Sequence, residues 1–133
     1  MIKVIKPGFY TTVQDLGRYG YQQYGVPFSG VLDVYAASVA NMLLGNEAND
    51  AVLEMTMTGP TLQFISKTSI CISGADMSPK LNQYPIAINK EIGVNDGDIL
   101  SFGKLNQGFR SYLAVLEVLK PKRLWAAEAF IME

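Results

Sequence analysis

The sequence predicts a mainly β domain that carries one main α-helix. Eight short runs are rich in β-branched and aromatic residues, and 12 Gly and 6 Pro separate them along the chain. Only one segment places its apolar residues at helical spacing. A chain of 133 residues is long enough for one domain that buries about two-thirds of its unfolded surface. Short strands at this spacing are typical of an antiparallel sandwich or barrel.

The expected strands are short, and most alternate apolar with polar residues between turn signals. They cover 2–5, 9–13, 51–57, 61–65, 69–73, 84–88, 98–102 and 110–115. Gly59 and Pro60 end the third strand, and Asn95-Asp96-Gly97 predicts the turn before the seventh, because Gly accepts a positive φ.

The expected helix covers residues 31–44. The apolar residues that its spacing places on one face are Leu32, Tyr35, Ala36, Val39, Leu43 and Leu44. Ser29 or Gly30 is the expected cap at its start, and Asp33 suits the positive end of the dipole in the first turn. We favour this role for Asp33 over that of a catalytic base. Gly45-Asn46 is a fitting end.

Composition excludes several classes of site and partner. Without histidine there is no Ser-His-Asp triad, no Cys-His pair and no His-ligated metal, and we expect no metal site. The single cysteine, Cys71, cannot form an internal disulfide and is expected to be a core thiol.

The net charge of −1 argues against nucleic-acid binding. No apolar run reaches the roughly 20 residues of a membrane helix, and the N-terminus lacks a signal peptide, so we expect a cytoplasmic protein without a membrane partner.

The densest group of polar side chains joins a strand to a glycine-rich loop at 11–20. Gln14, Asp15 and Arg18 offer an amide, a carboxylate and a guanidinium, which together suit a planar polar ligand such as a ureido or amide group. Gly17 permits a close approach of the backbone. The alternative, which the residues alone favour, is that Asp15 and Arg18 pair within a simple connector.

A second candidate segment is the loop 21–30, which contains Gly25, Pro27 and Ser29. Loops this long in compact domains are often functional. Ser29, together with N–H groups of the first helical turn, could hold an anionic or carbonyl oxygen. The alternative is a helix cap with nothing bound.

Glu54 is a carboxylate on an alternating strand, where Val52 and Thr56 share its face. The pattern leaves two positions open for it: burial beside the Arg18 loop, or exposure to solvent. It does not assign a catalytic base.

The same segments, taken as a series, resemble the biotin-dependent carboxyltransferase family. The blocks are Gly8-x-x-Thr11-Thr12-Val13-Gln14-Asp15-x-Gly17-Arg18-x-Gly20, Gly25-Val26-Pro27-x-Ser29-Gly30-x-x-Asp33, Ala40-Asn41-x-Leu43-Leu44-Gly45-Asn46, Leu53-Glu54-x-Thr56-x-x-Gly59-Pro60, Ser73-Gly74-Ala75 and Gly108-x-Arg110-Ser111-Tyr112-Leu113-Ala114-Val115. Their order makes the resemblance specific, and it covers residues 2–115. The family includes the C subunit of 5-oxoprolinase, allophanate hydrolase subunit 2, KipA and part of the carboxyltransferase domain of urea carboxylase.

The resemblance implies a cyclophilin-like β-barrel module that acts on a small amide-like substrate: 5-oxoproline, urea or allophanate. It implies two partners, which are a KipI-like B subunit and a lactam-hydrolase A subunit. ATP is then used at the level of the complex, biotin comes through a partner, and no cofactor is expected on this chain alone. The implied substrate-binding residues are Gln14, Asp15, Arg18, Ser29 and Asp33, and the structural or site-lining residues are Gly17, Gly25, Pro27, Asn41 and Glu54.

The resemblance also predicts two parts, a carboxyltransferase module at 1–115 and a non-family tail at 116–133. The tail can be tested against the genetic code by taking codons that are permitted for it and reading them in a frame shifted by two bases. In that frame they can encode Gly-Gly-Phe-Lys-Thr-Glu-Lys-Val-Met-Gly-Ser-Arg-Ser-Phe-Tyr. This is the block with which the sequences of the family continue. We therefore expect a frameshift near Leu116 and a truncated N-terminal portion. Truncation would expose apolar surface that a homodimer could cover.

Three functional hypotheses follow from the resemblance. The first is a component of a 5-oxoprolinase or carboxyltransferase complex, incomplete in this chain. The second is a KipA-like regulator that binds and antagonises a KipI-like kinase inhibitor. The third is a folded fragment without activity.

Overall fold

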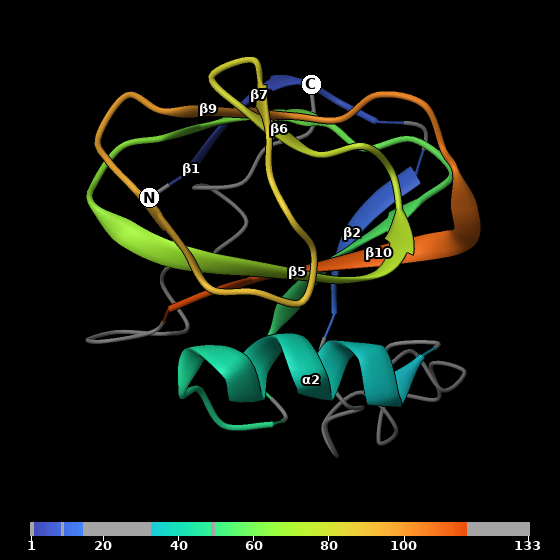
Figure 1. Cartoon of the computed structure of the whole chain (residues 1–133). Helices are drawn as coiled ribbons and strands as arrows, with labels where there is room; N and C mark the ends of the chain where they lie inside the picture. The colour runs from blue at the N-terminus through green and yellow to red at the C-terminus, as the bar shows by residue number, and fades with distance from the viewer. Residues whose placement is uncertain (1, 9, 15–32, 49, 117–133) are drawn as a thin grey trace, which may run out of the picture.

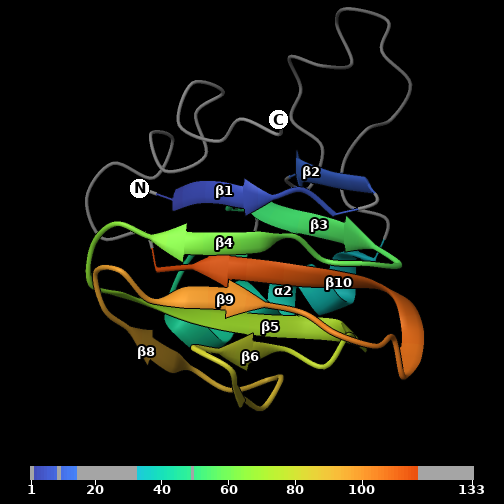
Figure 2. The same cartoon turned by 90° about the horizontal axis from the view of Figure 1, so that it is seen from above.

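The computed structural model describes residues 2–8, 10–14, 33–48 and 50–116, and its strands form two stacked antiparallel sheets (Figure 1). In the first sheet the neighbouring strands are β1 (Ile2–Lys6), β4 (Thr61–Phe64), β9 (Ile99–Ser101), β6 (Lys80–Leu81) and β7 (Tyr84–Pro85). In the second they are β2 (Tyr10–Gln14), β3 (Val52–Thr56), β10 (Gln107–Val115), β5 (Thr68–Asp76) and β8 (Ile92–Val94). Figure 2 shows the two sheets from above.

The mainly β fold with one main helix is confirmed for the described residues, and its strands stack as two sheets without closing into one hydrogen-bonded barrel. The expected strand 84–88 shrinks to Tyr84–Pro85, which pairs with β6 in a short hairpin. Strand β8 was not predicted, because its central Gly93 interrupts a very short apolar run. The full lengths of β5 and β10 were not predicted either, since their outer ends contain glycine.

The main hydrophobic core lies between the two sheets. Alternate residues of the second sheet point into it, including Leu53 of β3 and Leu113 of β10, and they meet Leu62, Phe64 and Leu100 of the first sheet. Each of these side chains is at most 1% exposed. The apolar surface that they bury is the main stabilising contribution to the fold.

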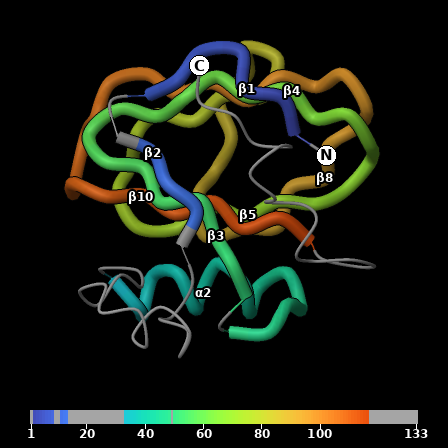
Figure 3. Tube along the Cα trace, turned by 180° about the vertical axis from the view of Figure 1, so that it is seen from behind, coloured from blue at the N-terminus to red at the C-terminus, as the bar shows by residue number. Residues whose placement is uncertain are grey.

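The helix α2 (Val34–Leu44) covers the other face of the second sheet (Figure 3). It packs there through a stripe of small residues, Ala36, Ala37 and Ala40, against side chains of β3, β5 and β10. The expected apolar face was therefore wrong for Tyr35 and Leu43, which are 80% and 46% exposed. Alanines let the helix backbone approach the sheet closely, and this leaves the larger side chains outside.

The expected start of the helix also needs correction. The cap is Asp33, neither Ser29 nor Gly30, and α2 begins at Val34, whereas the expected helix began at residue 31. Asp33 is the N-cap residue itself and does not belong to the first turn. Its Oδ1 accepts a hydrogen bond of 3.0 Å from the backbone N–H of Ala36, which satisfies a group that has no partner inside the helix.

The expected helix end at Gly45 is confirmed. Gly45 has φ +85°, and its N–H and that of Asn46 donate to carbonyls of the last turn. Asn41, expected to be structural or site-lining, is fully buried, and its Nδ2 donates to the carbonyl of Asp50 at 2.8 Å. It thus holds the loop after the helix.

The helical part of the described segments is too short to cross a membrane. No helix in them combines the length and the apolar character that a bilayer requires.

Candidate functional site

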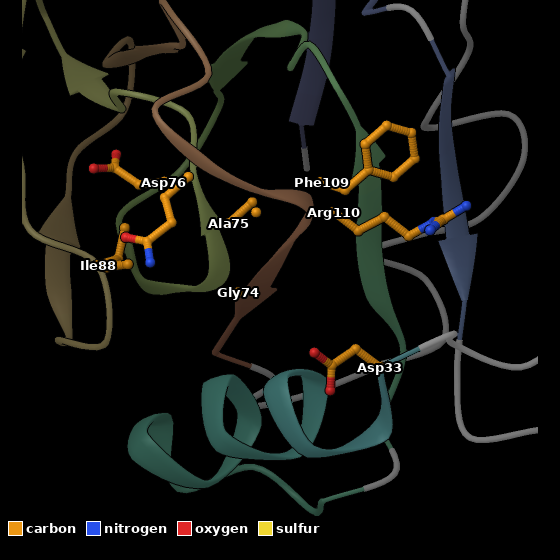
Figure 4. A pocket seen from close by; sticks show the side chains of 9 residues that line it. Asp33, Gly74, Ala75, Asp76, Ile88, Phe109 and Arg110 are labelled. Atoms are coloured by element: carbon orange, nitrogen blue, oxygen red, sulfur yellow. The ribbon is translucent and has the colours of Figure 1, made fainter.

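A cavity of about 530 Å³ opens where β5 and β10 run past the start of α2 (Figure 4). Its lining comes from three separate parts of the chain: the helix cap, the end of β5 with residue 88, and the first half of β10. The lining residues are Asp33, Gly74, Ala75, Asp76, Ile88, Gln107, Gly108, Phe109 and Arg110.

A bulge between β5 and β10 shapes one wall of the cavity. Gln107 pairs with Asp76, but the next paired residue of β10 is Ser111, opposite Gly74, so β10 has extra residues here. Gly74 has φ +93°, and a Cβ there would lie 2.7 Å from the carbonyl oxygen of Arg110. Glycine is therefore required at this position for the two backbones to approach each other.

Two carboxylates line the cavity, and the backbone holds each in place. Asp33 Oδ1 accepts from the N–H of Ala36, and Asp76 Oδ1 accepts a 3.0 Å bond from the N–H of Ser78. They come from different segments of the lining: Asp33 lies at the start of α2, and the Asp76 carboxylate points to the side away from Arg110 (Figure 4).

Among the described residues, the one cationic side chain of this lining is Arg110. It is half-buried, and its guanidinium carbon lies 5.0 Å from the centre of the Phe109 ring, within the range of a cation–π contact. Within the described part of the chain, Arg110 forms no ion pair with Asp33, with Asp76 or with any other carboxylate. Groups of opposite charge thus share the cavity without neutralising one another.

Behind the cavity, a buried hydrogen-bond chain fixes the start of the helix on the sheet. The Tyr112 hydroxyl donates a 2.7 Å bond to Oε2 of Glu54, and the backbone N–H of Asp33 donates to the same hydroxyl at 2.9 Å. Glu54 is 5% exposed. Of the two positions that the sequence left open, burial and exposure to solvent, the structure shows burial. Burial, followed by the hydrogen bond to Glu54, raises the pKa of Tyr112 well above its usual value.

Among the residues expected from the sequence, Asp33 lines the cavity, Glu54 supports it through Tyr112, and Asn41 lies near the other end of the helix. The backbone of Gln14 ends β2 opposite Val52. The other expected residues lie outside the described segments, as does the Gln14 side chain, so their roles stay predictions. They are Asp15, Gly17, Arg18, Gly25, Pro27 and Ser29.

Three residues of the site, Arg110, Asp76 and Gln107, were not predicted from the sequence. A signal was present, because Ser73-Gly74-Ala75 and Gly108-x-Arg110 both belong to the blocks of the resemblance. Their pattern indicates only the ends of strands, since nothing in the sequence shows that β5 and β10 pair through a bulge.

The cavity can accommodate a small ligand that both donates and accepts hydrogen bonds. Carboxylates accept from N–H groups, and a guanidinium donates to carbonyl or carboxylate oxygens. An amide or ureido group has both kinds of partner in one plane. The described residues include no group of three His, Cys, Asp or Glu side chains that could hold a metal ion.

Comparison with known proteins gives one matching family model and several named relatives. A family model described as "Carboxyltransferase domain, subdomain A and B" matches residues 24–131. Urea amidolyase of Lachancea kluyveri is 47% identical over 114 residues, which cover 85% of this chain and 6% of the relative. The C subunit of the 5-oxoprolinase of Escherichia coli is 37% identical over 115 residues, 86% of this chain and 37% of the relative.

A solved structure, that of the K. lactis urea amidolyase, superposes with a TM-score of 0.80 at 45% identity and covers 86% of this chain and 7% of that one. The chain thus spans only a small part of the urea amidolyases and just over a third of the oxoprolinase relative. The match of the family model continues past residue 115, and the boundary expected there stays a prediction. This chain belongs to the family of the carboxyltransferase domain, subdomain A and B.

Proposed function

We propose that this chain is one component of a carboxyltransferase-type or 5-oxoprolinase complex and binds a small amide-like substrate: 5-oxoproline, urea or allophanate. The observation that carries the proposal is the cavity whose lining combines the acidic residues Asp33 and Asp76 with the cationic Arg110. The names of the relatives, which are urea amidolyases and oxoprolinase subunits, support this class of substrate.

Each charged group of the cavity has a role in this proposal. Asp33 or Asp76 accepts an N–H group of the amide, and Arg110 donates to a substrate oxygen. The predicted contribution of Gln14, Asp15, Arg18 and Ser29 to substrate binding is part of the same proposal. No catalytic base is assigned.

The proposed partners are a KipI-like B subunit and a lactam-hydrolase A subunit, in a cytoplasmic complex. Two relatives are named as the C subunit of a 5-oxoprolinase, which supports assembly with other subunits. ATP and biotin then act through those partners. The cavity lining holds two carboxylates and one guanidinium, a charge balance that disfavours a polyphosphate at this position.

A KipA-like regulator and an inactive fragment are the alternatives to an enzyme component. The relatives described above have the names of enzymes or of enzyme subunits, which supports the enzyme component. A homodimer also stays a proposal. It is supported by large apolar side chains that α2 leaves exposed, namely Val34, Tyr35, Met42 and Leu43.

The test is co-purification of the tagged full chain from its native cells, followed by assays of 5-oxoproline and urea consumption with ATP present. We expect both partner subunits in the eluate together with turnover of one of these substrates. Asp33→Asn and Asp76→Asn keep the oxygen that accepts the backbone N–H but lose the charge, so turnover should fall at least tenfold without loss of stability.

The matched control is Asp96→Asn, an exposed aspartate in the turn before β9. Capture of a KipI-like protein without any turnover would support the regulator instead. Normal turnover in both cavity variants would remove this cavity from the function.

A further inference from the structure

The guanidinium of Arg110 is placed for an anion that the described residues do not supply. It extends from β10 along the face of the second sheet that carries α2, and Phe109 packs against it at 5.0 Å (Figure 4). A half-buried guanidinium binds best to a carboxylate or phosphate, with which it forms two parallel charge-assisted hydrogen bonds. Within the described residues it has no such partner.

The two aspartates of the cavity do not serve as that partner. The Oδ1 atom of each is held by a backbone N–H, that of Ala36 or that of Ser78. In Figure 4, Asp76 lies on the opposite side of the cavity from Arg110 with its carboxylate pointing away, and Asp33 lies at the start of the helix below Arg110. The cavity is thus polarised, with acceptors toward Asp33 and Asp76 and a donor at Arg110.

A second observation concerns Thr56, which is the neighbour of Arg110 on the sheet but is not one of the residues that line the cavity. Thr56 lies directly opposite Arg110 in the ladder between β3 and β10, so the two side chains leave the sheet on the same face. It is 5% exposed, and its hydroxyl oxygen has no hydrogen-bond partner among the residues that the structure describes. Buried hydroxyls nearly always have a hydrogen-bond partner. The Thr56 hydroxyl therefore leaves a hydrogen-bonding position open for a polar group of a ligand.

We propose that Arg110 forms a carboxylate subsite, so that the cavity takes amides that carry a carboxylate in preference to neutral amides. This inference rests on the proposed function, since it places the amide of the same ligand against Asp33. Two sources share the required chemistry: a lactam with a carboxylate on carbon, as in 5-oxoproline, and a urea with a carboxylate on nitrogen, as in allophanate.

Calorimetric titration of the full chain with two matched pairs of ligands tests the subsite. The pairs are 5-oxo-L-proline with 2-pyrrolidinone, and allophanate with urea. The two members of each pair share the same amide group and differ in the carboxylate, which only one of them carries. We expect the carboxylate-bearing member of at least one pair to bind at least tenfold more tightly, and the pair that shows the preference identifies the source.

The variant Arg110→Gln should abolish that preference, because it should weaken the binding of the carboxylate-bearing member of each pair far more than that of the neutral amide. The control is Lys67→Gln, which removes one positive charge from an exposed site before the far end of β5. Propionate, a carboxylate without an amide, completes the set of probes. Circular dichroism spectra of both variants establish that they are folded.

The outcomes separate this inference from the proposed function. Equal binding of both members of each pair, or an undiminished preference in Arg110→Gln, overturns the subsite and leaves amide binding intact. Propionate binding that depends on Arg110, together with no effect of any amide, supports the subsite and contradicts the proposed substrate class. No binding of any of the five probes overturns both.

Discussion

The hydroxyl of Tyr112 donates a 2.7 Å hydrogen bond to Oε2 of Glu54 on the sheet face that α2 covers. The two residues lie directly opposite each other in the ladder of β10 and β3. The same hydroxyl accepts from the backbone N–H of Asp33, the residue that begins the helix and lines the cavity. One phenol therefore links the sheet, the helix and the site.

Tyr112→Phe should lower the free energy of unfolding by about 2 kcal/mol, because it removes both hydrogen bonds of a fully buried hydroxyl. Guanidinium chloride denaturation measures the loss, and it avoids urea, a candidate ligand. Tyr84→Phe, at a tyrosine that is 75% exposed, is the control and should change the stability by less than about 0.5 kcal/mol. Equal stability of Tyr112→Phe and wild type would show that the link contributes nothing.

Stability should fall at alkaline pH because of the same residue. Burial and the bond to Glu54 raise the pKa of Tyr112 above its reference value of 10.0 in the folded state. The folded state then holds this proton more tightly than the unfolded state, so the contribution of Tyr112 is complete below about pH 10 and is lost as the pH rises further, by up to about 1.4 kcal/mol per pH unit.

Denaturation between pH 8 and pH 11 measures this slope, and the comparison with Tyr112→Phe isolates it. The pKa of Cys71, which burial raises, adds a slope of the same sign, but that slope is common to both proteins. The prediction fails if wild type and Tyr112→Phe lose stability in parallel above pH 10.

Two glycines with the same φ angle allow the cost of backbone strain to be separated from the cost of a close contact. Gly74 lies in the cavity wall, and Gly97 lies in the turn before β9. Gly74 and Gly97 both have φ +93°, but a Cβ has open space at Gly97, whereas at Gly74 it would lie 2.7 Å from the carbonyl oxygen of Arg110. Gly97→Ala should cost about 1 kcal/mol, the strain of a left-handed alanine. Gly74→Ala should cost clearly more, because β5 and β10 must also move apart. Thermal unfolding of both variants checks this, and equal losses would mean that the contact at Gly74 is unimportant.

Thr56→Val should raise the stability of the ligand-free chain by about 1 kcal/mol, since valine keeps the shape and removes a buried hydroxyl that has no partner among the described residues. Thr68→Val is the matched control, because the Thr68 hydroxyl donates to the carbonyl of Leu116 at 3.5 Å and its removal should bring no gain. Denaturation by guanidinium chloride compares the two. A loss of stability in Thr56→Val would show that its hydroxyl is satisfied after all.

The sequence predicted the local features whose causes are local. The β-rich pattern, the helix with its end at Gly45 and the shared face of Val52, Glu54 and Thr56 follow from periodicity and from the conformational freedom of glycine. Glu54 and Asp33 were singled out, but their connection through Tyr112 was not, because it depends on a strand pairing across 58 residues of sequence.

The helix face and the cavity could not be predicted in this way. Both depend on how the helix packs on the sheet, where the small Ala36, Ala37 and Ala40 pack more closely than the larger Tyr35 and Leu43. Arg110 belongs to the stretch of β10 that bulges opposite Gly74, and this stretch lines the cavity. These are tertiary effects, which a single sequence does not encode in its periodicity.

The central claim is that a small amide binds in the cavity between Asp33, Asp76 and Arg110. The most direct measurement is NMR titration of the ¹⁵N-labelled full chain with 5-oxo-L-proline and with urea, following the backbone amide signals. We predict saturable shifts that are largest at Gly74, Ala75, Gly108 and Phe109. Shifts confined to residues far from this cavity, such as Lys67 or Gly93, or no shift with either ligand, would contradict the claim.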